Sequence, residues 1–277
     1  MMIYFFIKLL RGQMDTVFQI EEIQQGCTKC GEFKENNFTF AYQPIVDIHN
    51  QEIFGYEALV RDRVTKTAKA VLDKVNAENR YAFDQTCRVK AISMANQLGL
   101  DRVLSINFLP NAVYEPKHCI QSTIRAAEMS GFPLDKIMFE VTESEKVYDT
   151  KHLKNIFDYY QSKGFVTALD DFGAGHAGLN MLINFIPNII KLDMELVRDV
   201  DSSTVKQVVV NTTLEMAKQL NITVLAEGVE TLGEAKFFAE KGVYLMQGYL
   251  FAKPGYESLP GVSQELLAQV SQSFTPN

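Results

Sequence analysis

The chain has 277 residues, of which 47% are hydrophobic and 22% are charged, a balance typical of globular proteins rather than disordered ones. Its formal net charge is −7, and no run of lysine or arginine is dense enough to suggest a nucleic-acid-binding face, which argues against a polymeric nucleic-acid partner. The opening stretch MMIYFFIKLL is too short to span a membrane, and the four cysteines do not form a secreted-type framework. We therefore expect a cytoplasmic protein without a membrane span.

Residues 1–37 are predicted to form a flexible N-terminal extension that precedes a single domain at 38–277. The extension contains the motif CTKC, whose Cys27 and Cys30 have the spacing of half a structural zinc site. No second pair follows, because Cys87 and Cys119 stand alone. Reduced cysteines are the favoured interpretation, and a zinc or redox role is the alternative.

From residue 38 onward, short apolar runs alternate with longer helical patterns, which is typical of a βα-repeating fold. The first two runs are separated only by HNQE, too short for a helical crossover, so we expect an antiparallel hairpin. Helical spacing of apolar residues occurs at 70–100, 203–221 and 232–242. The eight predicted strands are 38–48, 53–61, 103–108, 137–143, 166–171, 189–193, 223–228 and 244–251.

Eight strands with intervening helices favour an α/β fold of the variant (β/α)8 TIM-like barrel type with an antiparallel first strand. An open doubly wound sheet is less favoured, because no glycine-rich dinucleotide fingerprint follows any strand. Polar side chains stand near the carboxyl ends of nearly all of these strands, and in a barrel those ends meet at one mouth. They are Glu57, Asn107, Glu140, Glu143, Asp170, Asp171, Lys191, Asp193, Glu227 and Gln247.

Carboxylates that converge in a low-dielectric mouth cannot all stay ionised without a counter-charge. Taken singly, each polar residue could be a helix N-cap or a satisfied core group, but the convergence of so many favours a ligand site. Oxygen-bearing side chains without histidine suit Mg²⁺ or Mn²⁺ better than Zn²⁺. A bridging carboxylate with a neighbour is what a two-metal hydrolytic site needs to activate water for in-line displacement at phosphorus.

The segment TALDDFGAGHAG places Asp170 and Asp171 side by side at the end of an apolar run. Alternation along a strand sends neighbouring side chains to opposite faces, so both cannot point into the barrel while the chain stays extended. We expect the strand to break at Phe172 and Gly173, which lets Asp171 turn toward the same mouth as Asp170.

Six motifs, in this order and spacing, resemble the EAL-domain family over about residues 38–260: YEALVR (56–61), FEVTE (139–143), LDDFGAG (169–175), KLD (191–193), AEGVE (226–230) and QGYLFAKP (247–254). The resemblance implies a metal-dependent phosphodiesterase that cleaves cyclic di-GMP to linear pGpG and lowers this second messenger in bacterial signalling. It further implies two Mg²⁺ or Mn²⁺ ions per site, inhibition by Ca²⁺, and a homodimer formed through helices near strands five and six. The apolar segment 176–186 suits such an interface.

The resemblance also implies a role for each matching position. Asp170 would bridge the two metals, Glu227 would orient or deprotonate the attacking water, and Lys191 would contact that water or the scissile phosphate. The implied metal ligands are Glu57, Asn107, Glu140, Asp170, Asp171 and Gln247. The implied catalytic residues are Glu227, Lys191 and Glu57, and the substrate-binding residues are Gln43, Arg61, Asp193 and Gln247. Glu143 and Glu230 would support the site from outside it, Glu143 by anchoring the loop after strand five.

One departure from the family pattern lies in that loop. Many members have Thr, Tyr and Ser after the paired aspartates, whereas this chain has Ala174, His176, Ala177 and Gly178. We expect this difference to affect regulation more than catalysis, and His176 to be an ordinary loop or helix-start residue. The rival hypothesis is a non-catalytic cyclic di-GMP receptor that signals through dimer conformation. Because every expected ligand type is present, the enzyme is favoured.

Overall fold

The computed structural model describes residues 37–113, 115–142, 149–175 and 178–276. The predictions for the extension with Cys27 and Cys30, and those for Glu143, His176 and Ala177, fall outside these residues. The boundary between extension and barrel therefore stays a prediction.

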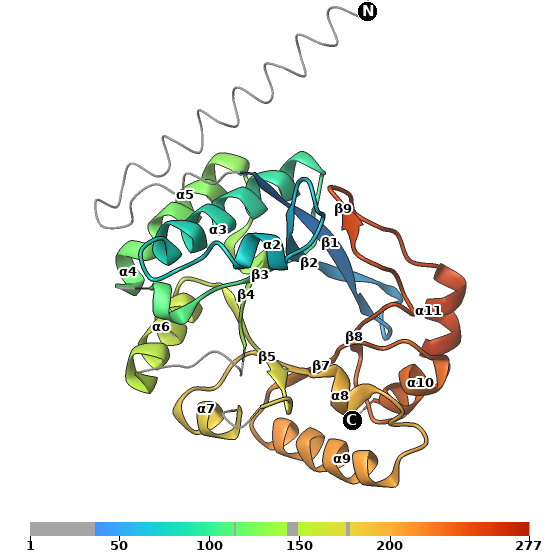
Figure 1. Cartoon of the computed structure of the whole chain (residues 1–277). Coiled ribbons are helices and arrows are strands. Elements are labelled where there is room, and N and C mark those ends of the chain that lie inside the picture. The colour runs from blue at the N-terminus through green and yellow to red at the C-terminus, as the bar shows by residue number, and fades with distance from the viewer. Residues whose placement is uncertain (1–36, 114, 143–148, 176–177, 277) are drawn as a thin grey trace, which may run out of the picture.

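Eight strands close into a barrel, as predicted, and the first runs antiparallel to both of its neighbours (Figure 1). Strands β2 to β8 follow one another in parallel, and β1 closes the ring between β8 and β2. A ninth strand of two residues, β9 (Gly255–Tyr256), pairs with Tyr42 and Ala41 of β1. The barrel strands are β1 (Phe38–Asp47), β2 (Glu52–Asp62), β3 (Val103–Asn107), β4 (Ile137–Thr142), β5 (Val166–Phe172), β6 (Ile189–Leu192), β7 (Thr223–Ala226) and β8 (Leu245–Gln247).

Helices surround the barrel on its outer side (Figure 1). The longer ones are α3 (Arg80–Gln97), α5 (Gln121–Ser130), α6 (Thr150–Ser162), α7 (Gly178–Asn184), α9 (Thr204–Gln219), α10 (Leu232–Glu240) and α11 (Gln264–Ser271). Short ones are α2 (Lys69–Leu72), α4 (Pro116–Cys119) and α8 (Met194–Val197), with 3₁₀ turns η1 (Pro110–Ala112) and η2 (Leu134–Lys136). Among the described residues, none of these helices has the length and hydrophobicity needed to cross a bilayer.

The prediction of a single helix at 70–100 is wrong, because the chain forms α2 and α3 with a turn between them. In that turn the Asn76 side-chain oxygen accepts hydrogen bonds from the amides of Glu78 (2.9 Å) and Asn79 (3.2 Å), and the Asn79 side chain accepts one from the Asn76 amide. Asparagine side chains that bond nearby backbone offer an alternative to the helical ladder. The spacing of apolar residues gives no sign of these side-chain hydrogen bonds.

The strands β7 and β8 end earlier than predicted. β8 stops at Gln247 because the next residue, Gly248, lies against the backbone of Val229, where a Cβ atom would come within 2.0 Å of the Val229 carbonyl oxygen. The chain therefore turns directly after the last inward-facing residue of the strand. As a result, the polar side chains at these strand ends lie at the rim of the barrel.

Candidate active site

The interior of the barrel is apolar at the end remote from the carboxyl ends of its parallel strands. One side chain from each of six strands forms this floor, namely Ile45, Met138, Ala168, Ile189, Leu225 and Leu245. Because side chains alternate along a strand, the residue two positions nearer the mouth points to the same interior. These residues are Gln43, Glu140, Asp170, Lys191, Glu227 and Gln247. A ring of polar groups thus stands directly on an apolar floor.

Lys191 occupies the centre of this ring and is fully buried. Its Nζ atom lies 2.7 Å from a carboxylate oxygen of Glu227, 2.9 Å from Glu140 and 3.0 Å from Asp170. A fourth carboxylate, that of Glu57, is 3.8 Å away. One positive charge therefore faces four acidic groups, which leaves the cluster short of positive charge.

The pKa values of the cluster reflect this imbalance. Burial would lower the pKa of Lys191, but the surrounding carboxylates, Asp170 foremost, raise it well above its usual value. Burial, with repulsion from neighbouring carboxylates, raises the pKa of Glu140 to about 8 and that of Glu227 well above its usual value. Burial also acts to raise the pKa of Asp170, yet the ammonium of Lys191 holds it below the usual range. The site therefore favours additional positive charge.

Asp171 reaches the same mouth through a change in backbone direction. Its φ of +53° is left-handed, and the pairing of β5 with β6 shifts register between Leu169 and Phe172. Aspartate tolerates this conformation better than most residues. The strand ends at Phe172 and the turn follows at Gly173, whose φ is +100°, as expected, but the backbone already changes direction at Asp171, inside the strand. One oxygen from each of Asp170, Asp171 and Glu227 lies within 4.8 Å of the others, and burial, followed by the charge of Asp170, raises the pKa of Asp171 to about 6.

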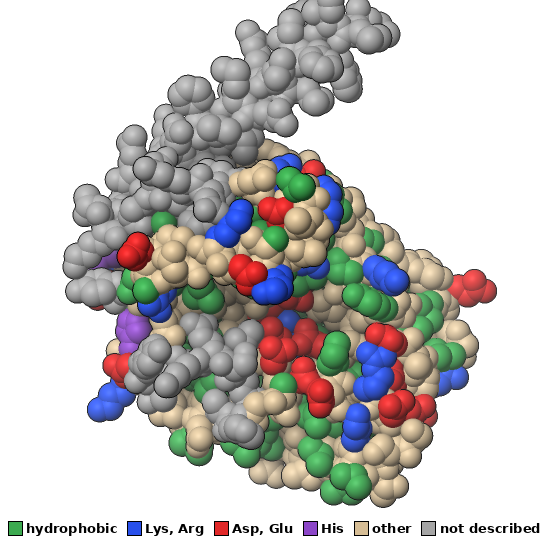
Figure 2. All heavy atoms as spheres, viewed as in Figure 1, with side chains coloured by type: hydrophobic (Ala, Val, Ile, Leu, Met, Phe, Trp, Pro, Cys, Tyr) green, Lys and Arg blue, Asp and Glu red, His purple; other side chains and the backbone are tan. Residues whose placement is uncertain are grey.

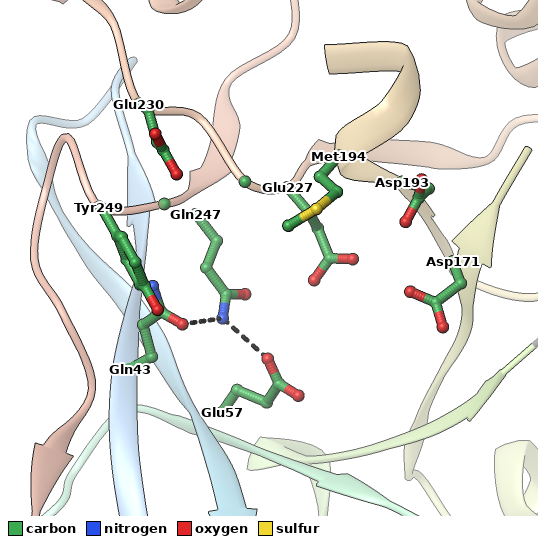
Figure 3. A pocket seen from close by; sticks show the side chains of 11 residues that line it. Gln43, Glu57, Asp171, Asp193, Met194, Glu227, Glu230, Gln247 and Tyr249 are labelled. Atoms are coloured by element: carbon green, nitrogen blue, oxygen red, sulfur yellow. Dashed lines mark hydrogen bonds between the residues drawn. The ribbon is translucent and has the colours of Figure 1, made fainter. Parts of the chain in front are cut away.

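Amide side chains hold Glu57 from two sides. Asn107 Nδ2 donates to one carboxylate oxygen at 3.0 Å, and Gln247 Nε2 donates to the other at 2.8 Å. Gln247 also donates to Gln43 at 3.3 Å, and Gln43 Nε2 donates in turn to the carbonyl of Ala252 at 3.2 Å. The antiparallel register makes this possible, because Gln43 pairs with Glu57 across β1 and β2 (Figure 3).

Acidic side chains gather in a central hollow on the face shown in Figure 2. A cavity of about 240 Å³ opens there. Figure 3 shows carboxylates of Glu57, Glu227, Asp171 and Asp193 directed into this space, two from strands β2 and β5 and two from the residues directly after β6 and β7. The cavity is lined by Gln43, Glu57, Asp171, Asp193, Met194, Glu227, Gly228, Glu230, Gln247, Gly248 and Tyr249.

Met194 and Tyr249 belong to this lining but were missed by the sequence reasoning. They are about half exposed, at 51% and 55%. Only their positions in the sequence could have indicated them, because Met194 directly follows Asp193 and Tyr249 follows Gln247 by two residues. From sequence alone, a largely apolar residue next to a predicted polar ligand is interpreted as a core residue.

Two predicted residues lie apart from the central cluster. Arg61 is in β2, four residues beyond Glu57, and its guanidinium donates to the carbonyl of Val60 at 2.8 Å. It does not line the cavity in the described part of the chain. Glu230 lies at the rim, where it accepts a hydrogen bond of 2.8 Å from Arg198. The predicted metal ligands, by contrast, all lie together in the described structure.

Three buried oxygen atoms in the site accept no hydrogen bond from the described residues, Glu140 Oε1, Asp170 Oδ1 and Gln247 Oε1, although Asp170 Oδ1 is in an ion pair with Lys191. A buried acceptor without a donor is costly, and a cation would satisfy it. The available donors are carboxylate and amide oxygens, which hard divalent ions prefer. The residues present therefore fit a site for divalent cations.

Comparison with known proteins agrees with this geometry. A family model described as the EAL domain matches residues 23–254. A crystal structure of a standalone versatile EAL protein from Vibrio cholerae O395, in its c-di-GMP-bound form, is 52% identical with a TM-score of 0.82, and the match covers 84% of this chain and 99% of that one. Klebsiella pneumoniae BlrP1, solved with manganese and cyclic di-GMP at pH 9.0, is 34% identical with a TM-score of 0.75, over 82% of this chain and 58% of that one.

Two curated relatives from Escherichia coli K12 are similar over most of the chain. The "Blue light- and temperature-regulated antirepressor BluF" is 29% identical over 228 residues, which cover 82% of this chain and 57% of the relative. The "Probable cyclic di-GMP phosphodiesterase PdeN" is 30% identical over 233 residues, which cover 80% of this chain and 44% of the relative. The chain thus spans about half the length of these relatives. On its motifs, its barrel and the extent of the family match, this protein belongs to the EAL-domain family.

Proposed function

We propose that this protein is a phosphodiesterase that hydrolyses cyclic di-GMP to linear pGpG and so lowers the level of this second messenger in bacterial signalling. The observation that carries the proposal is the acidic cluster around Lys191, in which every expected ligand type meets at one cavity. The named activity of PdeN and the cyclic di-GMP bound to the Vibrio cholerae protein support it. Action in the cytoplasm stays a prediction from the sequence.

We propose two divalent cations, Mg²⁺ or Mn²⁺, as the cofactors. Such ions supply Lewis acidity, which activates water and neutralises charge at the phosphodiester. Asp170 and Asp171 would hold these ions, which is supported by their reaching the same mouth from adjacent positions in β5. The remaining ligands would be Glu57, Asn107, Glu140 and Gln247.

The groups around the cations would position water and substrate. Glu227 faces the cavity and lies 2.7 Å from Lys191, so it would orient or deprotonate the attacking water while Lys191 contacts that water or the scissile phosphate. Gln43, Asp193 and Gln247 would bind substrate within the cavity, and Arg61 would meet its phosphate from further along β2.

The size of the cavity suits one part of the substrate. At about 240 Å³ it is smaller than typical pockets for drug-sized ligands, which are about 300–1,000 Å³. It would therefore enclose the phosphodiester, while the bases lie at the rim. Met194 and Tyr249 offer exposed apolar surface there, on which a base can rest.

The test is turnover by the purified full chain. Cyclic di-GMP with Mg²⁺ or Mn²⁺ should yield linear pGpG, and Ca²⁺ should inhibit the reaction. Glu57→Ala and Asp170→Ala should each abolish it, whereas Asp158→Ala, which removes an exposed carboxylate of α6, should leave it unchanged. Hydrolysis that persists in both site variants would contradict the assigned roles.

The second candidate is a non-catalytic receptor for the same nucleotide. The name of BluF, an antirepressor, keeps this candidate open, because antirepression is a binding activity rather than a hydrolytic one. Tight binding of cyclic di-GMP without product, in the presence of both metals, would select the receptor.

We also propose a homodimer formed through the neighbouring helices α7 and α9. Leu179 and Ile183 of α7 and the following Ile186 are exposed, with Ile183 at 82%. On α9 the exposed Val205, Val208 and Val209 have the spacing of one helix face.

The oligomeric state of single variants tests this interface. Light scattering after size-exclusion chromatography should give a dimer for the wild type and a monomer for Ile183→Asp. The control is Val64→Asp, at a similarly exposed position (77%) between β2 and α2. A dimer that survives the α7 change would place the interface elsewhere.

A further inference from the structure

A buried ion pair lies outside the cavity, in helix α3. Asp84 and Arg88 are one helical turn apart, their side chains are 1% and 0% exposed, and Arg88 Nη2 donates to Asp84 Oδ2 at 2.6 Å. Arg88 Nη1 also donates to the hydroxyl of Thr123 in α5 at 3.3 Å. Placing two charges in an apolar wall is costly, and well-packed hydrophobic residues often serve stability as well or better. The pair therefore calls for an explanation other than stability.

The second oxygen of Asp84 reaches the loop that follows β3. Asp84 Oδ1 accepts a hydrogen bond of 2.9 Å from the backbone N–H of Leu109. The amide of Phe108 donates to the carbonyl of Glu140 in β4 at 3.0 Å. Two consecutive amides are thus fixed from different sides, one by the neighbouring strand and one by the helix that covers β3 from outside (Figure 1).

This loop starts at a residue of the site. Asn107 is the last residue of β3, and its side chain donates to Glu57 Oε1 at 3.0 Å. Its side chain lacks the close packing of its strand neighbours, since Asn107 is exposed while Ser105 and Ile106 are buried. The direction of the Asn107 side chain therefore depends on how the backbone after it is held.

We propose that the Asp84–Arg88 pair is a positioning element that sets Asn107 for cation binding, through the amide of Leu109. Arg88 holds the Asp84 carboxylate in one orientation through its hydrogen bond to Oδ2, and Oδ1 of that carboxylate fixes the loop. Ligands need to be held within about 0.5 Å of their working position, and loss of such outer support typically costs 10–100-fold in metal affinity. The inference rests on the proposed function, in which Asn107 is a cation ligand.

The test is a Mn²⁺ titration by calorimetry, together with melting temperatures. Asp84→Leu/Arg88→Met removes both charges, so it leaves no unpaired ion in the wall, but it also removes the acceptor for Leu109. We expect about a tenfold or greater loss of Mn²⁺ affinity, with a cooperative unfolding transition retained. Asp84→Asn, which keeps an acceptor oxygen, should lose less affinity.

Two comparisons separate positioning from general destabilisation. Val270→Ala opens a cavity under α11, away from β3, and should lower the melting temperature without changing Mn²⁺ affinity. Asn107→Ala added to Asp84→Leu/Arg88→Met should weaken Mn²⁺ binding little further, because both changes act on one ligand.

Unchanged Mn²⁺ affinity in the folded Asp84→Leu/Arg88→Met protein, or full additivity with Asn107→Ala, would overturn the positioning role. A wild-type protein that binds no Mn²⁺ would instead refute the metal-dependent function on which the inference rests. Wild-type Mn²⁺ binding without turnover would leave the positioning role intact and favour the receptor.

Discussion

Glu234 holds two loops of the site together, and its replacement should loosen both. Its carboxylate accepts hydrogen bonds from the amides of Asp199 (3.0 Å), Glu230 (2.9 Å) and Thr231 (2.9 Å), and its own amide donates to the Thr231 hydroxyl. Asp199 follows β6 and the other two follow β7, so one buried carboxylate joins the loops that carry Asp193 and Glu227.

The cost of Glu234→Ala can be worked from these bonds. A hydrogen bond to a charged group contributes about 1.5–3 kcal/mol, but water can reach part of the freed amides because all three donor residues are exposed. We therefore expect a loss of about 2–3 kcal/mol in the free energy of unfolding. Glu234→Gln keeps one acceptor oxygen and should lose about 1 kcal/mol.

The ionisation of Glu234 adds a pH dependence with a defined sign. Burial would raise its pKa, but the backbone hydrogen bonds from Glu230, Asp199 and Thr231 bring the pKa below its usual value. A lowered folded-state pKa gives stability that is complete above the unfolded value of about 4.3 and is lost as pH falls through the folded value. The difference between wild type and Glu234→Gln should therefore shrink in acid.

The assay is urea unfolding at about pH 7 and again at about pH 3.5, with linear extrapolation of the free energy. Glu240→Ala, an exposed acid at the end of the same helix, should stay within about 0.5 kcal/mol of wild type. A change below about 0.5 kcal/mol for Glu234→Ala, or an equal gap between wild type and Glu234→Gln at both pH values, would refute the reasoning.

Three further changes give distinct outcomes. Lys191→Met leaves four facing carboxylates without their cation. The melting temperature of the metal-free protein should therefore fall by about 10 °C, and Mn²⁺ should restore part of the loss. An unchanged melting temperature would contradict the charge imbalance. Gly173→Ala should cost about 2 kcal/mol in urea unfolding, because φ is +100° and the new Cβ would lie 2.4 Å from a methyl carbon of Leu196, whereas Gly261→Ala meets open space and should be near neutral. The melting temperature of wild type should rise with protein concentration, as for a dimer, whereas that of Ile183→Asp should not, because its exposed side chain lies in the proposed interface; the same concentration dependence in both proteins would contradict an interface through α7.

The barrel could be predicted because its signals are local and repeated. Five of the parallel strands, β4 to β8, place an apolar floor residue two positions before a polar ring residue, as in Ile189 and Lys191 or Leu225 and Glu227. That period of two marks both the strand and its inward face. The hairpin followed equally simply from the short HNQE connection, and the structure confirms its antiparallel pairing.

What could not be predicted depends on contacts between distant segments. The left-handed backbone at Asp171 coincides with a register shift between β5 and β6, which no residue pattern within β5 specifies. The Asp84–Arg88 pair appears in the sequence as two charges in a helix, and its bond to Leu109 requires the fold to be known. The roles assigned to individual site residues stay predictions, since they need the ligand and metals as well as the fold.

The antiparallel direction of β1 also fixes where the rest of the polypeptide joins the barrel. Phe38, the first residue of β1, pairs with Asp62, which lies five residues beyond Glu57 on β2, and the carbonyl of Asn37 accepts a hydrogen bond from the amide of Arg63. In a barrel of parallel strands only, the first strand would start at the face remote from the cavity. Here any domain joined ahead of residue 37 meets the barrel on the side that carries the acidic cavity.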